Sequence, residues 1–332
     1  MDNFFTKKTT LILFGVVVIL LISFVFFLER KTEVLTSDVV TQLSSAEEVV
    51  YWKQQILKRG GPAAYADFVA MYLEQPYQIQ HTHAHVFGEA LYKVVGIEGV
   101  SVCDSNFGFG CFHSFFGWAM VANGTGIVKE LDVACIEAYG EKGLGCPHGI
   151  GHGVMVEIGT EHLDDALAIC SELNWQKPIG GCSSGVFMEY NQNTMGDGSL
   201  RAPKDDWHFP CNAVSDRYTE ACYFEQTTWW AGIMNDDFNF IGKRCAEIEV
   251  LADKQACFRG AGHTSNSVFS FNFVKMREAC SKMPDAEAEL LCVEGATWLT
   301  SWDSRFQDTW EQMCAGYADE ELIRCLNSKN FI

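Results

Sequence analysis

Histidine is the residue type whose placement in this sequence first suggests chemistry. Seven of the nine histidines lie in or beside segments where a helix is expected to begin. His148 and His152 stand four residues apart in Gly-Cys-Pro-His-Gly-Ile-Gly-His-Gly, so they would share one helix face. His81 and His85 form a second such pair, with His83 between them. Neutral imidazole is a ligand of Zn²⁺ and Cu²⁺, so the pattern predicts a candidate metal site.

Cysteines recur along the chain at a regular spacing, and the histidines lie beside them. From Cys111 onward, the second cysteine of each successive copy follows at intervals of 35, 36, 40, 35, 35 and 33 residues. A period of this size indicates tandem copies of one supersecondary unit. Each copy is expected to be a helical hairpin, with one cysteine near the end of its first helix and another opening its second. The first cysteines are Cys103, Cys135, Cys170, Cys211, Cys245, Cys280 and Cys314, and the second cysteines are Cys111, Cys146, Cys182, Cys222, Cys257, Cys292 and Cys325.

The two cysteines of one copy are expected to form a disulfide. They lie 11 or 12 residues apart, or eight in the first cysteine-containing copy, and the end of one helix faces the start of the next in an antiparallel hairpin. Pairing within copies uses all fourteen cysteines, whereas pairing between copies leaves Cys103 and Cys325 without a partner. No C-x-x-C pair occurs, which argues against zinc ribbons, thioredoxin-type redox sites and covalent haem attachment. The sequence therefore predicts seven disulfides and an oxidising compartment.

A hairpin without cysteines precedes these copies. It runs from Pro62 to Glu74 and from Gln78 to Val95, and Gly96 ends it. A small residue also recurs three positions after the second cysteine, which predicts close approach of neighbouring helices. These residues are Ser114, Gly149, Gly185, Gly260 and Gly295.

Aligning the copies brings histidines to equivalent positions. If His81 takes the place of the second cysteine, then His83, His113 and His148 all lie two positions after it. Equivalent positions of stacked helices are about 10 Å apart, a distance that two long side chains can close toward one ion. The sequence thus predicts a divalent transition metal, zinc, copper or iron, bound by His83, His113, His148 and His152.

These histidines have alternative interpretations. One is that they cap helices or form hydrogen bonds between copies. The partial positive charge of a helix N-terminus would also repel a bound cation, which disfavours a metal site. Another interpretation is acid–base catalysis. His85 lies at an otherwise apolar position, so we expect it half-buried beside Glu89 or another histidine. Residues 181–185 match the Gly-x-Ser-x-Gly sequence of a nucleophile elbow. We do not expect an elbow there, since Cys182 belongs to the cysteine pattern. The sequence assigns no catalytic residue and leaves open whether the chain is an enzyme.

The N-terminal region contains a predicted membrane anchor. Residues 11–28 are apolar apart from Gly15 and Ser23, and they would span about 27 Å as a helix. The run is too long for a signal-peptide core and lacks a cleavage site, so an uncleaved signal anchor is predicted. Basic residues flank both ends, and the cysteines therefore decide the orientation. The predicted parts are a cytoplasmic N-terminus at 1–10, the transmembrane anchor at 11–28, a stalk or capping helix at 29–61, and a periplasmic or extracellular cysteine-rich domain at 62–332.

Composition limits the classes of partner. The chain has 24 basic and 43 acidic residues, a formal charge of −19, which repels nucleic acid. The polar insertion at residues 191–208 lengthens one copy and is either an ordinary surface loop or a contact for a partner.

The copies of about 35 residues, each a helical hairpin, resemble tetratricopeptide-type repeats, and their cysteines are placed as in cysteine-rich secreted hairpin-repeat proteins. The resemblance covers roughly residues 62–332 and implies an all-α solenoid of seven to eight copies with a concave binding face. The tetratricopeptide Trp-Leu-Gly-Tyr pattern is absent, so no ligand is carried over. Two functions are predicted: a membrane-tethered scaffold that binds a protein or other ligand, or a metal-binding or metalloenzyme ectodomain.

Overall fold

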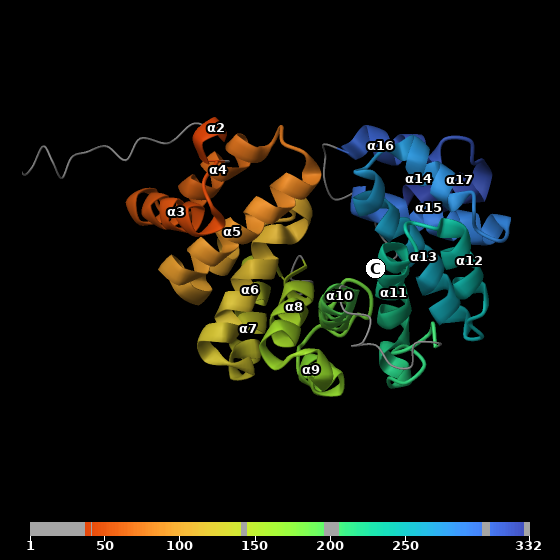
Figure 1. The fold of residues 1–332 in the computed structure, drawn as a ribbon, viewed down its shortest axis with the longest axis horizontal. Coiled ribbons are helices and arrows are strands. Elements are labelled where there is room, and N and C mark those ends of the chain that lie inside the picture. The colour runs from red at the N-terminus through yellow and green to blue at the C-terminus, as the bar shows by residue number, and fades with distance from the viewer. Residues whose placement is uncertain (1–36, 41, 141–144, 196–205, 301–305, 329–332) are drawn as a thin grey trace, which may run out of the picture. The chain divides into compact units, whose positions relative to one another are not determined.

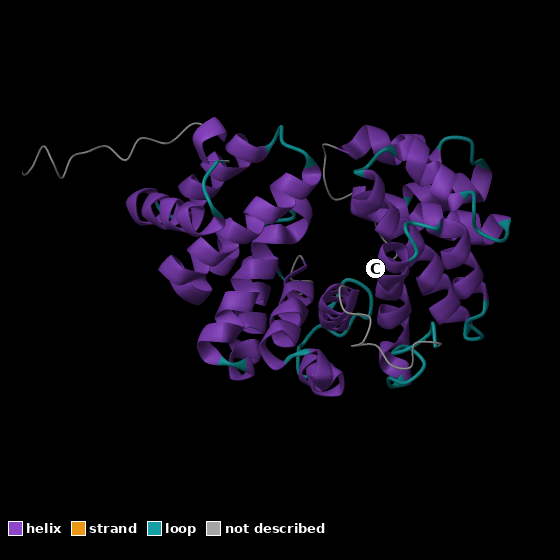
Figure 2. Ribbon diagram, viewed as in Figure 1, coloured by secondary structure: helices purple, strands orange, loops and turns teal. Residues whose placement is uncertain are grey.

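The computed structural model of this chain describes residues 37–40, 42–140, 145–195, 206–300 and 306–328. These residues form helices joined by loops, and no strand occurs among them (Figure 2). The all-α fold class implied by the resemblance to helical-hairpin repeats is confirmed for these residues.

The chain divides into two compact units, residues 1–42 and 43–332. The described part of the first unit contains the short helix α2 (Ser37–Val40). The predicted transmembrane anchor at 11–28 and cytoplasmic segment at 1–10 lie outside the described residues. Among the helices that are described, none is both long enough and apolar enough to cross a membrane.

The second unit begins with two helices whose ends follow from local sequence. Helix α3 (Ser45–Arg59) starts with a capping box, in which the Ser44 hydroxyl accepts from the Glu47 amide and the Glu47 carboxylate accepts from the Ser44 amide. It ends at Gly60, whose φ of 84° favours glycine. Helix α4 (Gly61–Tyr72) then starts with Pro62 in its first turn. One helix therefore stops and the next starts around Gly60.

The remaining helices alternate along the chain as expected for hairpins (Figure 1). Those that carry or precede the first cysteines are α7 (Val128–Tyr139), α9 (Leu163–Cys170), α12 (Phe238–Ala246), α14 (Phe273–Cys280) and α16 (Gln307–Cys314). Those that form second helices are α5 (Tyr77–Val95), α6 (Gly110–Asn123), α8 (Cys146–Ile158), α10 (Cys182–Met195), α11 (Thr219–Ile233), α13 (Leu251–Phe269), α15 (Ala286–Thr300) and α17 (Asp319–Leu326). Cys103 follows the 3₁₀ helix η1 (Gly96–Val102), and Cys211 lies in a turn, so neither lies at the end of an α-helix.

Helices α5, α6, α8, α10, α11, α13 and α15 pack against one another in that order. Glycine allows their backbones to approach closely. A Cβ at Gly185 would meet the His148 carbonyl of the preceding helix, and a Cβ at Gly295 would meet the Arg259 carbonyl in the same way. The close approach predicted from the recurring small residues is confirmed at these positions.

Glycines also fix the register of the hairpin that lacks cysteines. Gly151 lies five residues after the second cysteine of its copy, and a Cβ there would meet the carbonyl of the second cysteine in the next copy. Gly88 approaches the Cys111 carbonyl in the same way. Counting five residues back from Gly88 places His83, not His81, at the cysteine position. The predicted alignment was therefore wrong by two residues, because the first hairpin has no disulfide from which to count.

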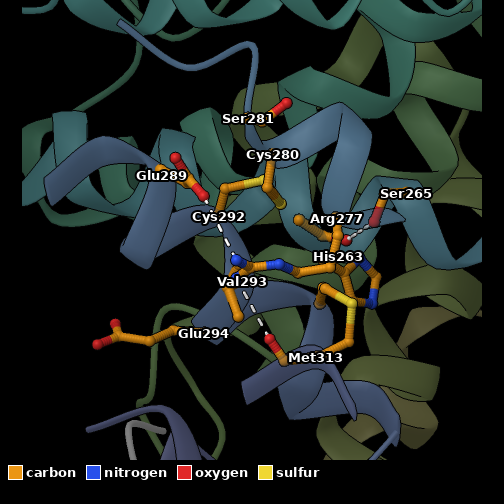
Figure 3. Close-up of a disulfide and its surroundings, with 12 residues drawn as sticks. His263, Ser265, Arg277, Cys280, Ser281, Glu289, Cys292, Val293, Glu294 and Met313 are labelled. Carbon is orange, nitrogen blue, oxygen red and sulfur yellow. Dashed lines mark hydrogen bonds and ion pairs between the residues drawn. A yellow bond between two sulfur atoms is a disulfide. The ribbon is translucent and has the colours of Figure 1, made fainter. Parts of the chain in front are cut away.

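All seven predicted disulfides are present, each within one copy. Figure 3 shows Cys280–Cys292, where the end of α14 meets α15. Arg277 of α14 is drawn near this disulfide: its guanidinium donates to the Met313 carbonyl at 3.3 Å and lies 3.6 Å from the Glu289 carboxylate. Six of the disulfides close loops of about 12 residues, each worth about 3 kcal/mol in the chain-entropy model, and Cys103–Cys111 closes a shorter loop.

Two helices far apart in sequence also touch within the second unit. The Gln78 side chain, at the start of α5, donates to the Ser267 carbonyl of α13 at 3.1 Å across a separation of 189 residues. The rings of Tyr77 and Phe271 pack edge to face nearby, with centroids 4.7 Å apart. The start of α5 is therefore held by the end of α13 as well as by its neighbour α6.

The predicted insertion at 191–208 is described only in part. Residues up to Met195 continue helix α10, and residues 196–205 lie outside the described part of the chain. At its end, the Trp207 carbonyl accepts hydrogen bonds from Trp230 at 3.0 Å and Gln226 at 3.3 Å. This end of the insertion is thus attached to α11.

Candidate metal centre

Five histidines gather where α5, α6 and α8 pack side by side (Figure 1). Helix α5 supplies His81 and His85, α6 supplies His113, and α8 supplies His148 and His152. All five lie within the first nine residues of their helices. Each helix packs against the next through small residues or aromatic rings, so side chains at equivalent places come together.

Each pair of histidines has the spacing that one metal ion needs. The Nε2 atoms of His81 and His85 are 3.1 Å apart, and those of His148 and His152 are 3.2 Å apart. Two nitrogens bound to one tetrahedral zinc at about 2.0–2.1 Å lie roughly 3.3 Å from each other. The i, i+4 spacing on a helix therefore produces two half-formed coordination sites.

His113 lies between the two pairs. Its ring centroid is 5.3 Å from that of His81 and 5.4 Å from that of His85. On its other side it is 4.4 Å from His152 and 5.8 Å from His148. His113 and either pair form a triad in which one ligand atom from each residue lies within 4.8 Å of the others.

Hydrogen bonds orient one ring in each pair. The His81 Nδ1 atom lies 2.7 Å from the Phe107 carbonyl, and the His152 Nδ1 atom lies 2.9 Å from the Glu189 carboxylate. Because both partners are acceptors, each neutral ring carries its proton on Nδ1 and its lone pair on Nε2. Orientation of this kind is usual for histidines that bind metal.

The carbonyl that orients His81 comes from a tight turn at the start of α6. Phe107, Gly108 and Phe109 have φ values of 55°, 62° and 63°, all in the left-handed region. Glycine takes this conformation readily, but the two phenylalanines do so at a cost in backbone strain. The turn brings the Phe107 carbonyl to His81 and leads directly into the helix that carries His113.

Burial keeps most of these imidazoles neutral. It lowers the pKa of His85 to about 3, and it also lowers the pKa of His81, His113 and His148. These four side chains are only partly accessible to solvent, and the protein that surrounds them disfavours the charged imidazolium form. The neutral ring is the form that donates a lone pair to a metal.

A carboxylate supports the second pair. Burial raises the pKa of Glu189, but hydrogen bonds from His152 and Asn193 outweigh it and leave the pKa below its ordinary value. Glu189 is therefore ionised beside His152. This negative charge compensates a cation bound to the ring and increases the ring's basicity as a ligand.

Three of the four predicted ligands, His113, His148 and His152, come together, but His83 does not join them. The His83 Nδ1 atom lies 2.6 Å from the Glu48 carboxylate and 3.1 Å from the Tyr72 hydroxyl. Its place is taken by His85, which shares the structural position of His113 and His148 once the register is corrected. The expectation that His85 is half-buried beside another histidine is confirmed, with His81 as that neighbour.

The sequence held the signal that identifies His81 and His85. They are an i, i+4 pair like His148 and His152, and this spacing is independent of the alignment between copies. The prediction instead chose ligands by their equivalent positions in the copies. That choice depends on how the first hairpin is aligned with the others, and the predicted alignment was wrong by two residues.

The later copies have no histidine at the equivalent position. The Ser184 hydroxyl there donates to the Glu225 carboxylate of α11. Further on, Arg259 forms an ion pair with Glu294 at 2.9 Å. The histidine cluster is thus confined to three neighbouring helices of the described chain.

Comparison with known proteins adds no assignment to this geometry: no family model, curated protein or solved structure matches the chain. The chemistry of the centre is therefore argued from its residues. Each triad offers three imidazole nitrogen donors, and a fourth position remains for water or another ligand, as in zinc sites with three protein ligands.

Proposed function

We propose that this protein binds a divalent transition metal through its histidine cluster. The observation that carries the proposal is the geometry of the two triads, in which His113 completes two separate pairs of correctly spaced imidazoles. An all-imidazole ligand set suits Zn²⁺ or Cu²⁺, whereas Ca²⁺ and Mg²⁺ prefer oxygen. Neither triad contains the carboxylate typical of non-haem iron sites, so zinc and copper are favoured over iron.

Helix capping does not account for these histidines. The N-cap residues of helices α5, α6 and α8 are Pro76, Phe109 and Gly145, and no side-chain cap hydrogen bond occurs at any of them. A hydrogen bond between the two Nε2 atoms of each pair is the stronger competitor, because it fits the same distances. It leaves the buried Nδ1 atom of His148 without a partner and gives no role to His113 between the pairs.

The site we propose belongs to an extracytoplasmic protein. Seven disulfides are typical of an oxidising compartment outside the cytoplasm. We further propose that residues 11–28 anchor the chain as a single span with its N-terminus in the cytoplasm, and that residues 62–332 form an α-solenoid. Alkaline extraction of membranes should leave the chain in the membrane fraction, and recovery in the soluble fraction would contradict the anchor.

The scaffold function predicted from the repeats stays a prediction. It is supported by the succession of helical hairpins, a form that often presents a binding surface for a protein partner. The histidine cluster provides a more specific observation, so metal binding is the function favoured here.

Metal analysis of the full-length oxidised chain, purified without chelator, tests the proposal. We expect zinc or copper in near-stoichiometric amount, and at least a tenfold loss in the double variant His113→Ala/His148→Ala. His162→Ala is the matched control, since its ring is 52% exposed and pairs with Asp165 at 3.2 Å. Retention of all seven disulfides in each variant establishes that it folds. Absence of metal from the unaltered chain, or equal metal in the double variant, would overturn the proposal.

A further inference from the structure

We propose that the cluster is a two-metal centre in which His113 bridges the ions. This inference rests on the proposed function and goes beyond it in stoichiometry and in the role of one residue. The first ion would be held by His113, His148 and His152, and the second by His81, His85 and His113. Each ion then has three imidazole nitrogens and an open position for water.

Two ions explain the arrangement better than one. Among the described residues, the groups of three ligand atoms that all lie within 4.8 Å of one another are these two triads, and no such group joins the α5 pair to the α8 pair. A single ion would use one pair and leave the other without a role. Since each pair already has the spacing for one ion, two ions use all five rings.

His113 is the ring that can serve both ions. No hydrogen bond joins either of its nitrogens to the described residues, whereas a hydrogen bond orients His81 and another orients His152. Its two nitrogens point to different sides of one ring, as a bridge requires. On binding the second ion, the ring gives its N–H proton to solvent and becomes imidazolate, which ligates both ions. The ions would then lie about 6 Å apart, the span of the ring and two metal–nitrogen bonds.

The two positions differ in the groups that hold their histidines, so they should fill in order. The Glu189 carboxylate lies 2.9 Å from the His152 Nδ1 atom in the α8 pair, whereas the Phe107 backbone carbonyl lies 2.7 Å from the His81 Nδ1 atom in the α5 pair. A carboxylate strengthens its histidine as a ligand and compensates the cation. The position that includes His152 is therefore expected to fill first.

Titration with Cu²⁺, followed by electron paramagnetic resonance, tests the bridge. All fourteen cysteines are in disulfides, so no thiol is present to reduce the copper. The first equivalent should give a signal that accounts for all the copper. The second should lower the integrated signal instead of doubling it, because unpaired electrons on two Cu²⁺ ions couple through imidazolate.

Variants separate the two positions. His85→Ala removes a ligand of the second position only and should bind one equivalent with a full signal. Glu189→Gln should weaken the first equivalent at least tenfold and leave the total at two. His162→Ala should behave as the unaltered chain does.

Binding of a single equivalent by the unaltered chain would overturn the two-metal centre and leave the proposed function standing. Two equivalents with undiminished signal would show that His113 is not a bridge, and no binding would overturn both proposals.

Discussion

At the scale of single residues, the burial of Glu225 should make the stability of the protein depend on pH. Its side chain is 1% exposed in α11, and the Ser184 hydroxyl donates to one carboxylate oxygen. Burial raises the pKa of Glu225 to about 8, and the hydrogen bond from Ser184 offsets only part of this. Glu225 is therefore a buried acid that holds its proton near neutral pH.

We expect this proton to make stability fall as pH rises. Because the folded-state pKa exceeds the ordinary value of 4.5, the stabilising contribution is complete below pH 4.5 and is lost as pH rises toward 8. Glu225→Gln removes the charge, so the variant should be more stable than the unaltered chain at pH 8.5 by roughly 2–5 kcal/mol. Denaturant unfolding at pH 5 and pH 8.5 measures the difference.

The control is Glu137→Gln, at an exposed position of α7. It should retain the pH dependence of the unaltered chain. Equal loss of stability with pH in the unaltered chain and in Glu225→Gln would show that Glu225 does not carry the effect.

At the scale of helices, glycine determines how closely the second helices pack. A Cβ at Gly262 in α13 would meet the Cys292 carbonyl and the Ala296 amide of α15. Gly262→Ala must therefore move two backbones apart, and we expect a loss of about 1–3 kcal/mol. Gly117 in α6 has no atom within 4 Å of its added Cβ, so Gly117→Ala should instead gain up to about 1 kcal/mol from helix propensity. Thermal unfolding distinguishes them, and a gain in both would contradict the close packing.

The register of α5 makes a second prediction at this scale. His83→Ala removes one partner of the fully buried Glu48, which keeps its bonds from Tyr72 at 2.8 Å and Trp52 at 3.0 Å. We expect a loss of about 1–3 kcal/mol in stability, since the buried Glu48 side chain loses a hydrogen-bond partner, with metal content unchanged. His85→Ala should lose metal with a smaller loss in stability. Unfolding and metal analysis of both variants check this, and the opposite outcome would restore the register predicted from the sequence.

Periodic signals made the helices, their order and all seven disulfides predictable. Cysteines counted along the chain locate each hairpin without knowledge of the packing, so Cys135 and Cys146 were paired correctly. The ligand set was only partly predictable, because it depends on register between helices. Register is set by backbone approaches such as that of Gly88 to Cys111, which no local pattern shows. The hydrogen bonds that His81 and His152 donate to Phe107 and Glu189 likewise depend on the folded chain.

At the scale of the whole molecule, the packing of the helical hairpins holds α5, α6 and α8 in fixed register, and this register brings the five histidines together. Disulfides clip the hairpins that carry His113 and His148. The α5 helix has no disulfide, and its start is instead fixed by the contact of Gln78 with Ser267 in α13. The ligands thus come from short segments distant in sequence, and their geometry is a property of the folded unit.

X-ray absorption at the zinc edge of the full-length oxidised chain loaded with zinc tests the metal centre most directly. The account predicts a shell of nitrogen atoms at about 2.0–2.1 Å with the outer scattering of imidazole rings. It predicts no sulfur ligand, because all fourteen cysteines are in disulfides. An oxygen shell without imidazole scattering, or a sulfur shell, would contradict the assignment of the histidine cluster as the metal site.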